Sequence, residues 1–177
     1  MPSPNLQPVL NGPTVTVRPI VESDWDGLYA MASDPQVWAL HPAKDRYQEA
    51  VFRKFFNEAI ASGTGFTFVD NASGKLIGSS RYNGFDPEKS EIEIGWTFLG
   101  REYWGGAYNA EIKKLMLDHA FSFVDTVLFW VGDTNWRSRK AVEKIGGKLR
   151  DGIFHRNPEQ DDPPHVIYEI TRASMVL

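Results

Sequence analysis

One change of hydrophobic period constrains the fold of this chain more than any other feature. Residues 90–99 (SEIEIGWTFL) alternate polar and apolar side chains, which predicts a strand. Residues 108–124 then place Ile112, Met116 and Phe123 on one side of a predicted helix, and 125–132 (DTVLFWVG) are nearly all apolar, as in a buried strand. A strand, a helix and a strand in direct succession predict a right-handed crossover between two parallel strands.

The remaining elements fit a single α/β domain. The sequence predicts helices at 22–34, 47–63 and 135–147, and strands at 14–20, 65–70, 75–83, 148–156 and 165–173. The three strands within 65–98 should form an antiparallel meander, so the sheet is expected to be mixed. Residues 1–13 hold three prolines and little periodicity, and we expect an extended arm there, followed by one domain over 14–177.

Composition excludes several classes of protein. The net charge of −4 disfavours a nucleic-acid binder, and the absence of cysteine excludes disulfides and a thiol nucleophile. No run reaches the ~20 apolar residues of a membrane helix, and the N-terminus lacks a signal-peptide core. The four histidines are scattered, without metal-ligand spacing. We therefore expect a cytoplasmic protein with no metal, nucleic-acid or membrane partner.

A glycine-rich corner separates the strand from the helix that follows it. In REYWGGAYNAE (101–111), Gly105, Gly106 and Ala107 would let a ligand approach the backbone where a helix begins. Helix N-termini present N–H groups and partial positive charge, which suits phosphate. Neither of the common nucleotide-binding glycine motifs is present. The alternative is a tight turn whose small residues serve packing alone.

A second corner follows the next strand. In NWRSRKAVEKIGG (135–147), Asn135 lies at the end of that strand and Ser138 lies in the first helical turn. Ligands bind at the carboxyl ends of parallel strands where the order of the sheet changes. The two corners are therefore expected to face one cleft.

These two segments resemble the GNAT superfamily of acetyl-CoA-dependent N-acetyltransferases. The chain has E-I-G-W at 93–96, Y-W-G-G-A-Y-N-A-E at 103–111 and N-x-x-S-x-x-x-x-E-K at 135–144. The order and spacing look most like the branch that acetylates ribosomal-protein N-termini (RimJ/RimL-like). The resemblance covers about residues 14–172. It implies a mixed, mostly antiparallel sheet splayed between its fourth and fifth strands, with helices on both faces.

The resemblance also implies where coenzyme A would bind. Its pyrophosphate would meet the N–H groups of the corner, and its pantetheine arm would run along the splayed strand. Asn135 would hold the pantetheine side or a water, and Arg101, Arg137, Arg139 or Lys140 could supply charge that a lysine usually provides at the position of Gly106. The predicted cofactor-binding residues are Phe98, Leu99, Arg101, Trp104, Gly105, Gly106, Ala107, Tyr108, Asn109, Asn135, Arg137 and Ser138.

The implied reaction is direct acetyl transfer to a primary amine through a tetrahedral intermediate. The amine must lose a proton and the leaving thiolate must gain one. Strand alternation places Glu91, Glu93, Gly95 and Thr97 on one face, and we expect Glu93 to act as the base, directly or through water. The alternative is a solvated sheet face. Ser138 is the candidate acid, and its alternative role is a helix-capping hydroxyl.

Several possibilities stay open at this point. The acceptor could be a protein N-terminus or a small amine such as an amino acid, a polyamine or an aminoglycoside. The protein could pair into a homodimer. The missing lysine at Gly106 and the absence of a tyrosine acid also allow a coenzyme A-binding sensor or scaffold without turnover.

Overall fold

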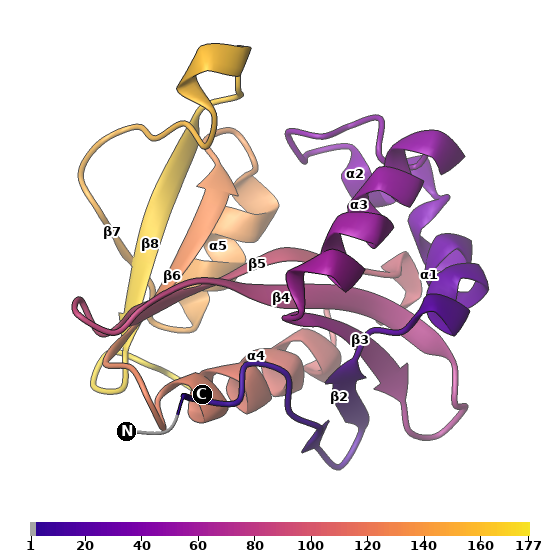
Figure 1. Ribbon diagram of the computed structural model, residues 1–177, viewed down its shortest axis with the longest axis horizontal. Helices are drawn as coiled ribbons and strands as arrows, with labels where there is room; N and C mark the ends of the chain where they lie inside the picture. The colour runs from indigo at the N-terminus through magenta and orange to yellow at the C-terminus, as the bar shows by residue number, and fades with distance from the viewer. Residues whose placement is uncertain (1–2) are drawn as a thin grey trace.

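The computed structural model describes residues 3–177 and shows one mixed sheet with helices on both faces (Figure 1). The strand order is β1-β2-β3-β4-β5-β6-β8-β7. The strands are β1 Leu10–Asn11, β2 Val15–Pro19, β3 Gly65–Asp70, β4 Leu76–Asp86, β5 Glu91–Leu99, β6 Thr126–Gly132, β7 Lys148–Leu149 and β8 His165–Thr171. The helices are α1 Trp25–Ala32, α2 Pro35–Trp38, α3 Glu49–Ser62, α4 Ala107–Ala120 and α5 Trp136–Lys144, with short 3-10 turns at Glu22–Asp24, Arg101–Tyr103 and Pro158–Gln160.

Two apolar clusters hold the helices to the sheet. The first joins α4 and α5 to one face and contains Ile92, Met116 and Val142. The second joins α1, α2 and α3 to the opposite face and contains Leu28, Phe52 and other aromatic rings. Burial of these side chains supplies the main favourable free energy of the fold.

The predicted connectivity of the sheet is confirmed. β3, β4 and β5 form the antiparallel meander, and β5 pairs with β6 in parallel, with α4 in the connection. This parallel pairing is short: only Glu91–Glu93 face Thr126–Leu128. Beyond these residues β5 stays with β4 and β6 stays with β8, so the two halves of the sheet diverge. The predicted fourth and fifth strands are therefore β5 and β6, because the two-residue β1 adds a strand at the edge.

The predicted alternation along β5 is wrong after Gly95. Trp96 has a φ of 53°, and the β4–β5 register shifts between Ser79 and Arg81. Such a bulge rotates the following residues by one position. Thr97 consequently faces α4, where its Oγ1 accepts a hydrogen bond from Lys113 Nζ at 3.3 Å, and it does not share a face with Glu93.

Two predicted segments differ from the structure in extent. The strand expected over 148–156 is ordered in the sheet only at Lys148–Leu149, with a single further bridge at Phe154. Gly152, at a φ of 116°, turns the chain out of the sheet between them. Within the arm expected over 1–13, β1 pairs with β2, and residues 1–2 lie outside the described residues.

Candidate active site

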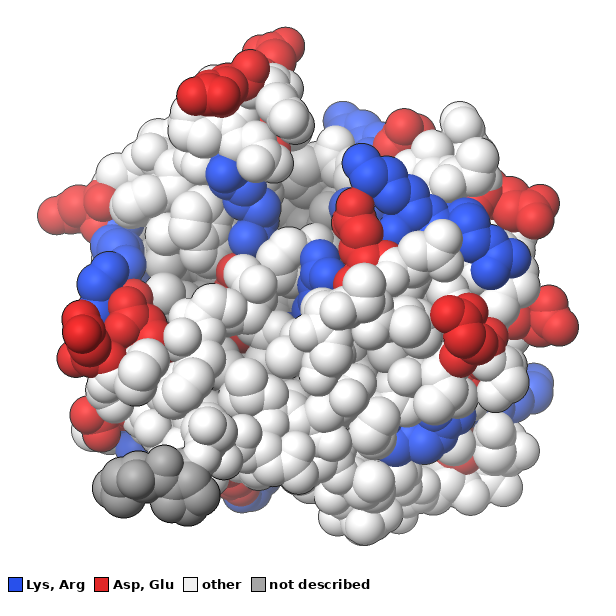
Figure 2. Space-filling view, viewed as in Figure 1, with Lys and Arg blue, Asp and Glu red and all other residues white. Residues whose placement is uncertain are grey.

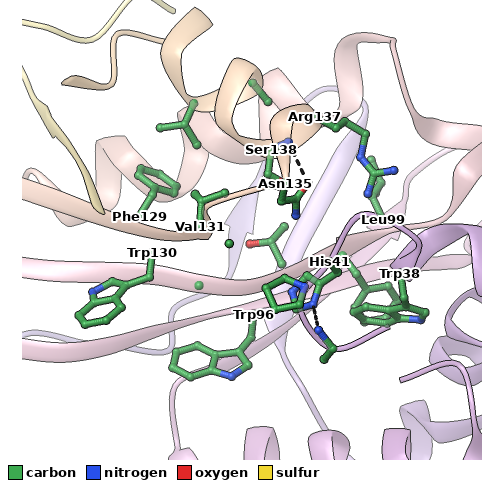
Figure 3. A pocket seen from close by; sticks show the side chains of 18 of the residues that line it. Trp38, His41, Trp96, Leu99, Phe129, Trp130, Val131, Asn135, Arg137 and Ser138 are labelled. Carbon is green, nitrogen blue, oxygen red and sulfur yellow. Dashed lines mark hydrogen bonds between the residues drawn. The ribbon is translucent and has the colours of Figure 1, made fainter. Parts of the chain in front are cut away.

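A cavity of about 520 Å³ occupies the split between β5 and β6. Its walls come from the divergent parts of these strands, from α4 and α5, and from the segment that follows α2. Figure 2 shows the surface hollowed between the two diverging halves of the molecule, with Lys and Arg atoms on both walls. Figure 3 shows side chains from both of these halves lining the cavity.

The glycine corner opens onto one end of the cavity. Gly105 has a φ of 70°, which L side chains rarely adopt, and a Cβ added there would meet nothing within 4 Å. Gly106 is the N-cap of α4 and offers no capping side chain, so the N–H groups of the first turn have no side-chain acceptor. Packing therefore does not explain why glycines occupy this corner, and the N–H groups at the start of α4 suit an anion.

Eight of the twelve predicted cofactor-binding residues line the cavity, and three of these belong to the glycine corner. Trp104 lies against it, and its indole Nε1 donates to the carbonyl oxygen of Leu99 at 2.7 Å, which ties the corner to the end of β5. Tyr108 points elsewhere, because its hydroxyl donates to Asp70 Oδ1 at 2.9 Å. The cavity lining includes Phe98, Leu99, Trp104, Gly105 and Asn109, and it does not include Gly106, Ala107 or Tyr108.

The two candidate arginines differ in position. Arg137 lines the cavity, its guanidinium lies 3.9 Å from the centroid of the Trp104 ring, and its Nη2 donates to the carbonyl oxygen of Val37. Burial lowers the pKa of Arg137. Arg101 is 54% exposed in its side chain and pairs with Asp34 at 2.6 Å. Arg137 is therefore the cation held beside the corner, and Arg101 is held outside the cavity lining.

The second corner brings Asn135 and Ser138 to the same cavity (Figure 3). Asn135 Oδ1 accepts the backbone N–H of Ser138 at 3.4 Å and caps α5. The capping bond expected as the alternative role of Ser138 is therefore made by Asn135. The Ser138 hydroxyl makes no hydrogen bond within residues 3–177, so it is available to a ligand.

Glu93 lies behind the cavity wall. It is only 4% exposed, both of its carboxylate oxygens contact the Arg156 guanidinium, and Oε1 also accepts from Asn83 Nδ2 at 3.2 Å. Gly95 makes room for this pair, since a Cβ at Gly95 would lie 2.6 Å from Glu93 Oε2. Arg156 lines the cavity and Glu93 does not.

A buried lysine on α4 was not among the site residues predicted from the sequence. Lys113 is 6% exposed and lines the cavity, where its Nζ lies near Thr97 and 5.2 Å from the centroid of the Phe129 ring. No carboxylate in residues 3–177 pairs with it, and burial lowers its pKa to about 8. The signal in the sequence was a lysine one turn after Asn109 and between the apolar positions Ile112 and Met116.

Two histidines from distant segments also line the cavity, His41 after α2 and His165 on β8. His41 Nδ1 accepts the backbone N–H of Ala43 at 2.9 Å, so a neutral ring carries its proton on Nε2. His165 Nδ1 lies 2.7 Å from the carbonyl oxygen of Pro163, so this nitrogen donates and a neutral ring keeps its lone pair on Nε2. Burial lowers the pKa of His41 to about 3 and also lowers that of His165.

Two absences hold for residues 3–177. None of their helices combines the length and apolar character that a membrane span requires. They contain no group of three or more His, Asp or Glu side chains placed to hold a metal ion.

Comparisons with known proteins agree with this geometry. A family model described as "Acetyltransferase (GNAT) domain" matches residues 14–148. A protein described as "Uncharacterized N-acetyltransferase p20" from Bacillus licheniformis is 27% identical over 113 residues, and the match spans 61% of this chain but only 63% of that relative.

Solved structures share the fold at low identity. A GCN5-related N-acetyltransferase from Brucella melitensis superposes with a TM-score of 0.82 at 21% identity, over 95% of this chain and 80% of that one. Mycobacterium smegmatis RimJ, in complex with CoA-disulfide, gives a TM-score of 0.68 at 20% identity, over 94% of this chain and 87% of that one. With the family model spanning most of its length, the chain belongs to the acetyltransferase (GNAT) domain family.

Proposed function

We propose that this protein transfers the acetyl group of acetyl-CoA directly to a primary amine. The observation that carries the proposal is the split between β5 and β6, which opens onto a glycine corner with a positive φ and an uncapped helix N-terminus. Acetyl-CoA supplies the activated acyl group as a thioester.

The residues present suit coenzyme A at this place. The N–H groups of residues 105–109, with the Arg137 guanidinium beside them, would hold the pyrophosphate. Beyond Glu93, the edge of β5 that faces β6 has no ladder partner among residues 3–177, so it can pair with an extended arm as an added strand would. Phe98 and Leu99 lie on this stretch and line the cavity.

The acceptor amine must lose a proton, and two residues of this chain could take it. Glu93 stays a candidate base, but the proton would have to reach a carboxylate already held by Arg156. His165 is better placed, because it lines the cavity and its contact with Pro163 leaves the Nε2 lone pair available. The Ser138 hydroxyl, which has no partner within residues 3–177, is our candidate for returning a proton to the leaving thiolate.

The acceptor is either a protein N-terminal α-amine or a small amine. The fold shared with RimJ, which was solved with CoA-disulfide, supports coenzyme A as the donor for either acceptor. At 20% identity this likeness concerns the fold, so it does not decide between the two acceptors.

Release of free thiol from acetyl-CoA, measured with a panel of amines, tests the proposal. We expect amine-dependent thiol release, reduced at least about tenfold in Ser138→Ala. Lys140→Ala, on the exposed face of the same helix, serves as the matched control. Coenzyme A binding without thiol release for any amine would instead support a sensor or scaffold.

A further inference from the structure

Three arginines from distant segments lie near Trp96 or near one another, and two of them, Arg46 and Arg156, line the cavity. Arg46 lies between α2 and α3, Arg81 lies on β4 and Arg156 lies between β7 and β8. The guanidinium carbons of Arg81 and Arg156 lie 3.7 Å and 4.3 Å from the centroid of the Trp96 ring, so two cations share one indole. In Figure 3, Trp96 lies on the opposite side of the cavity from Arg137.

Arg46 completes this group from the opposite wall. Its guanidinium lies 4.7 Å from the centroid of the Phe55 ring and 5.2 Å from that of Trp38, and it lines the cavity together with Arg156. Burial, opposed by Asp45 and Glu58 and assisted by Arg81 and Arg156, lowers the pKa of Arg46 to about 10.

The cations outnumber the carboxylates that pair with them. Glu93 pairs with Arg156, whereas no carboxylate of residues 3–177 comes within ion-pair distance of Arg46 or Arg81. The Arg81 Nε is buried and has no hydrogen-bond partner in this part of the chain, and the Arg46 guanidinium makes no hydrogen bond there. Desolvating a cation without a partner is costly, and the aromatic faces offset only part of that cost.

We propose that Arg46 and Arg156, which line the cavity, form an oxyanion subsite to which Arg81 on the Trp96 ring adds positive charge, and that the acceptor is a small amine carrying a carboxylate or a phosphate. This inference rests on the proposed transferase function and names the class of its acceptor. Guanidinium forks match planar carboxylates and phosphates and bind both more strongly than neutral groups. The phosphates of coenzyme A do not explain the two arginines on Trp96, because Arg137 stacks on Trp104 beside the glycine corner and Figure 3 shows Trp96 across the cavity from Arg137.

Paired acceptors test the subsite. Thiol release from acetyl-CoA is measured with free L-amino acids against their carboxamides, and with phosphoethanolamine against ethanolamine, each compared at equal concentration of the unprotonated amine. We expect at least one oxyanion-bearing member to exceed its neutral partner about tenfold or more in kcat/KM. The two pairs distinguish carboxylate from phosphate as the oxyanion recognised.

Variants assign the effect to the arginines. Arg46→Gln should lower kcat/KM for the oxyanion-bearing acceptor about tenfold more than for its neutral partner, so that the preference is lost, and Arg46→Lys should restore part of it. Arg53→Gln is the matched control, because Arg53 stacks on Trp25 at 3.4 Å and does not line the cavity. Equal rates for charged and neutral partners, or an equal loss for both in Arg46→Gln, would overturn the subsite.

A binding measurement separates this proposal from the transferase function. Quenching of tryptophan fluorescence by the same amino acids and carboxamides is followed without acetyl-CoA, since Trp96 and Trp130 flank Arg156. Oxyanion-selective quenching that is lost in Arg46→Gln, without any thiol release, would retain the subsite and refute the transferase. Thiol release without oxyanion selectivity in either assay would retain the transferase and refute the subsite.

Discussion

At the scale of single residues, Glu93 shows how a contact changes the chemistry that a side chain can perform. A glutamate on an alternating strand near a cleft is a reasonable base, and the sequence offers it. The structure adds Arg156, which reaches Glu93 from 63 residues away along the chain and contacts both carboxylate oxygens. No local pattern predicts so distant a partner, and the same holds for His165, whose role depends on where β8 lies.

Two substitutions compare the candidate bases. His165→Asn keeps a donor toward Pro163 and removes the Nε2 lone pair, so we expect kcat/KM to fall about 10²-fold or more. Because burial lowers the pKa of His165, the pH–rate profile of the wild type should decline only below about pH 6.5. This acidic limb of the profile should vanish in the variant. His155→Asn, an exposed histidine, is the control. A limb that survives His165→Asn and disappears in Glu93→Gln would make Glu93 the base.

Lys113 should make the fold less stable at neutral pH. Its pKa drops from 10.5 to about 8 on folding, a charge penalty on the order of 3 kcal/mol at about 1.4 kcal/mol per pH unit. Below pH 8 the lysine is protonated in both states and the penalty is complete. Between pH 8 and 10.5 the unfolded chain binds more protons, so this contribution makes stability rise with pH.

Urea unfolding of Lys113→Met checks this sign. The variant should be more stable than wild type at pH 7, and the difference should shrink by pH 10. Lys114→Met, whose side chain is exposed and pairs with Asp118, should change stability by less than about 0.5 kcal/mol at either pH. A Lys113→Met variant that is less stable at pH 7 would show that the amine is needed for packing.

At the scale of elements, hydrophobic period predicted most helices and strands. The alternation of 90–99 and the apolar run of 125–132 correspond to β5 and β6, and Gly63, the last residue of the helix expected over 47–63, follows α3 in the left-handed conformation. The predicted alternation missed the bulge at Trp96, where the register against β4 shifts, although Gly95 directly before it is a residue type that often marks a bulge within a strand. The bulge turns Thr97 toward Lys113 and places the Trp96 ring in contact with the guanidinium groups of two arginines.

The N-terminus of α5 combines a structural role with a proposed binding role at Asn135. Asn135→Ala should cost about 1 kcal/mol of stability through loss of the capping bond and should weaken coenzyme A binding. Asn135→Ser should restore the cap. Thermal unfolding and calorimetric titration of both variants separate the two roles. Full recovery of binding in Asn135→Ser would mean that Asn135 only caps the helix.

At the scale of the whole molecule, an acidic protein concentrates cations in one cavity. The net charge is −4, yet Arg46, Arg137, Arg156 and Lys113 line the space between the two halves of the sheet. Composition alone favours a cationic partner weakly, whereas the cavity favours anionic ligands. Overall charge and the charge of a site differ because folding sorts side chains that are distant in sequence.

The order of the two corners predicted the place of the cavity, and the divergence of β5 from β6 explains why the cavity exists. The sequence could not predict which side chains meet at the end of the cavity near Trp96. That end combines the segment after α2, the β4 arginine and the loop before β8, which meet only in the folded molecule.

Calorimetric titration with acetyl-CoA, with ATP and desulfo-coenzyme A as comparison ligands, tests the central claim most directly. Gly105→Val should lose at least about tenfold in affinity, because a side chain would enter the space beside the uncapped N–H groups of α4. Gly74→Val is the matched control, since Gly74 has a φ of 74° and open space around it but lies outside the cavity. Micromolar binding by wild type and Gly74→Val, lost in Gly105→Val, is the predicted result. No binding at millimolar acetyl-CoA, or equal affinity in all three proteins, would contradict it.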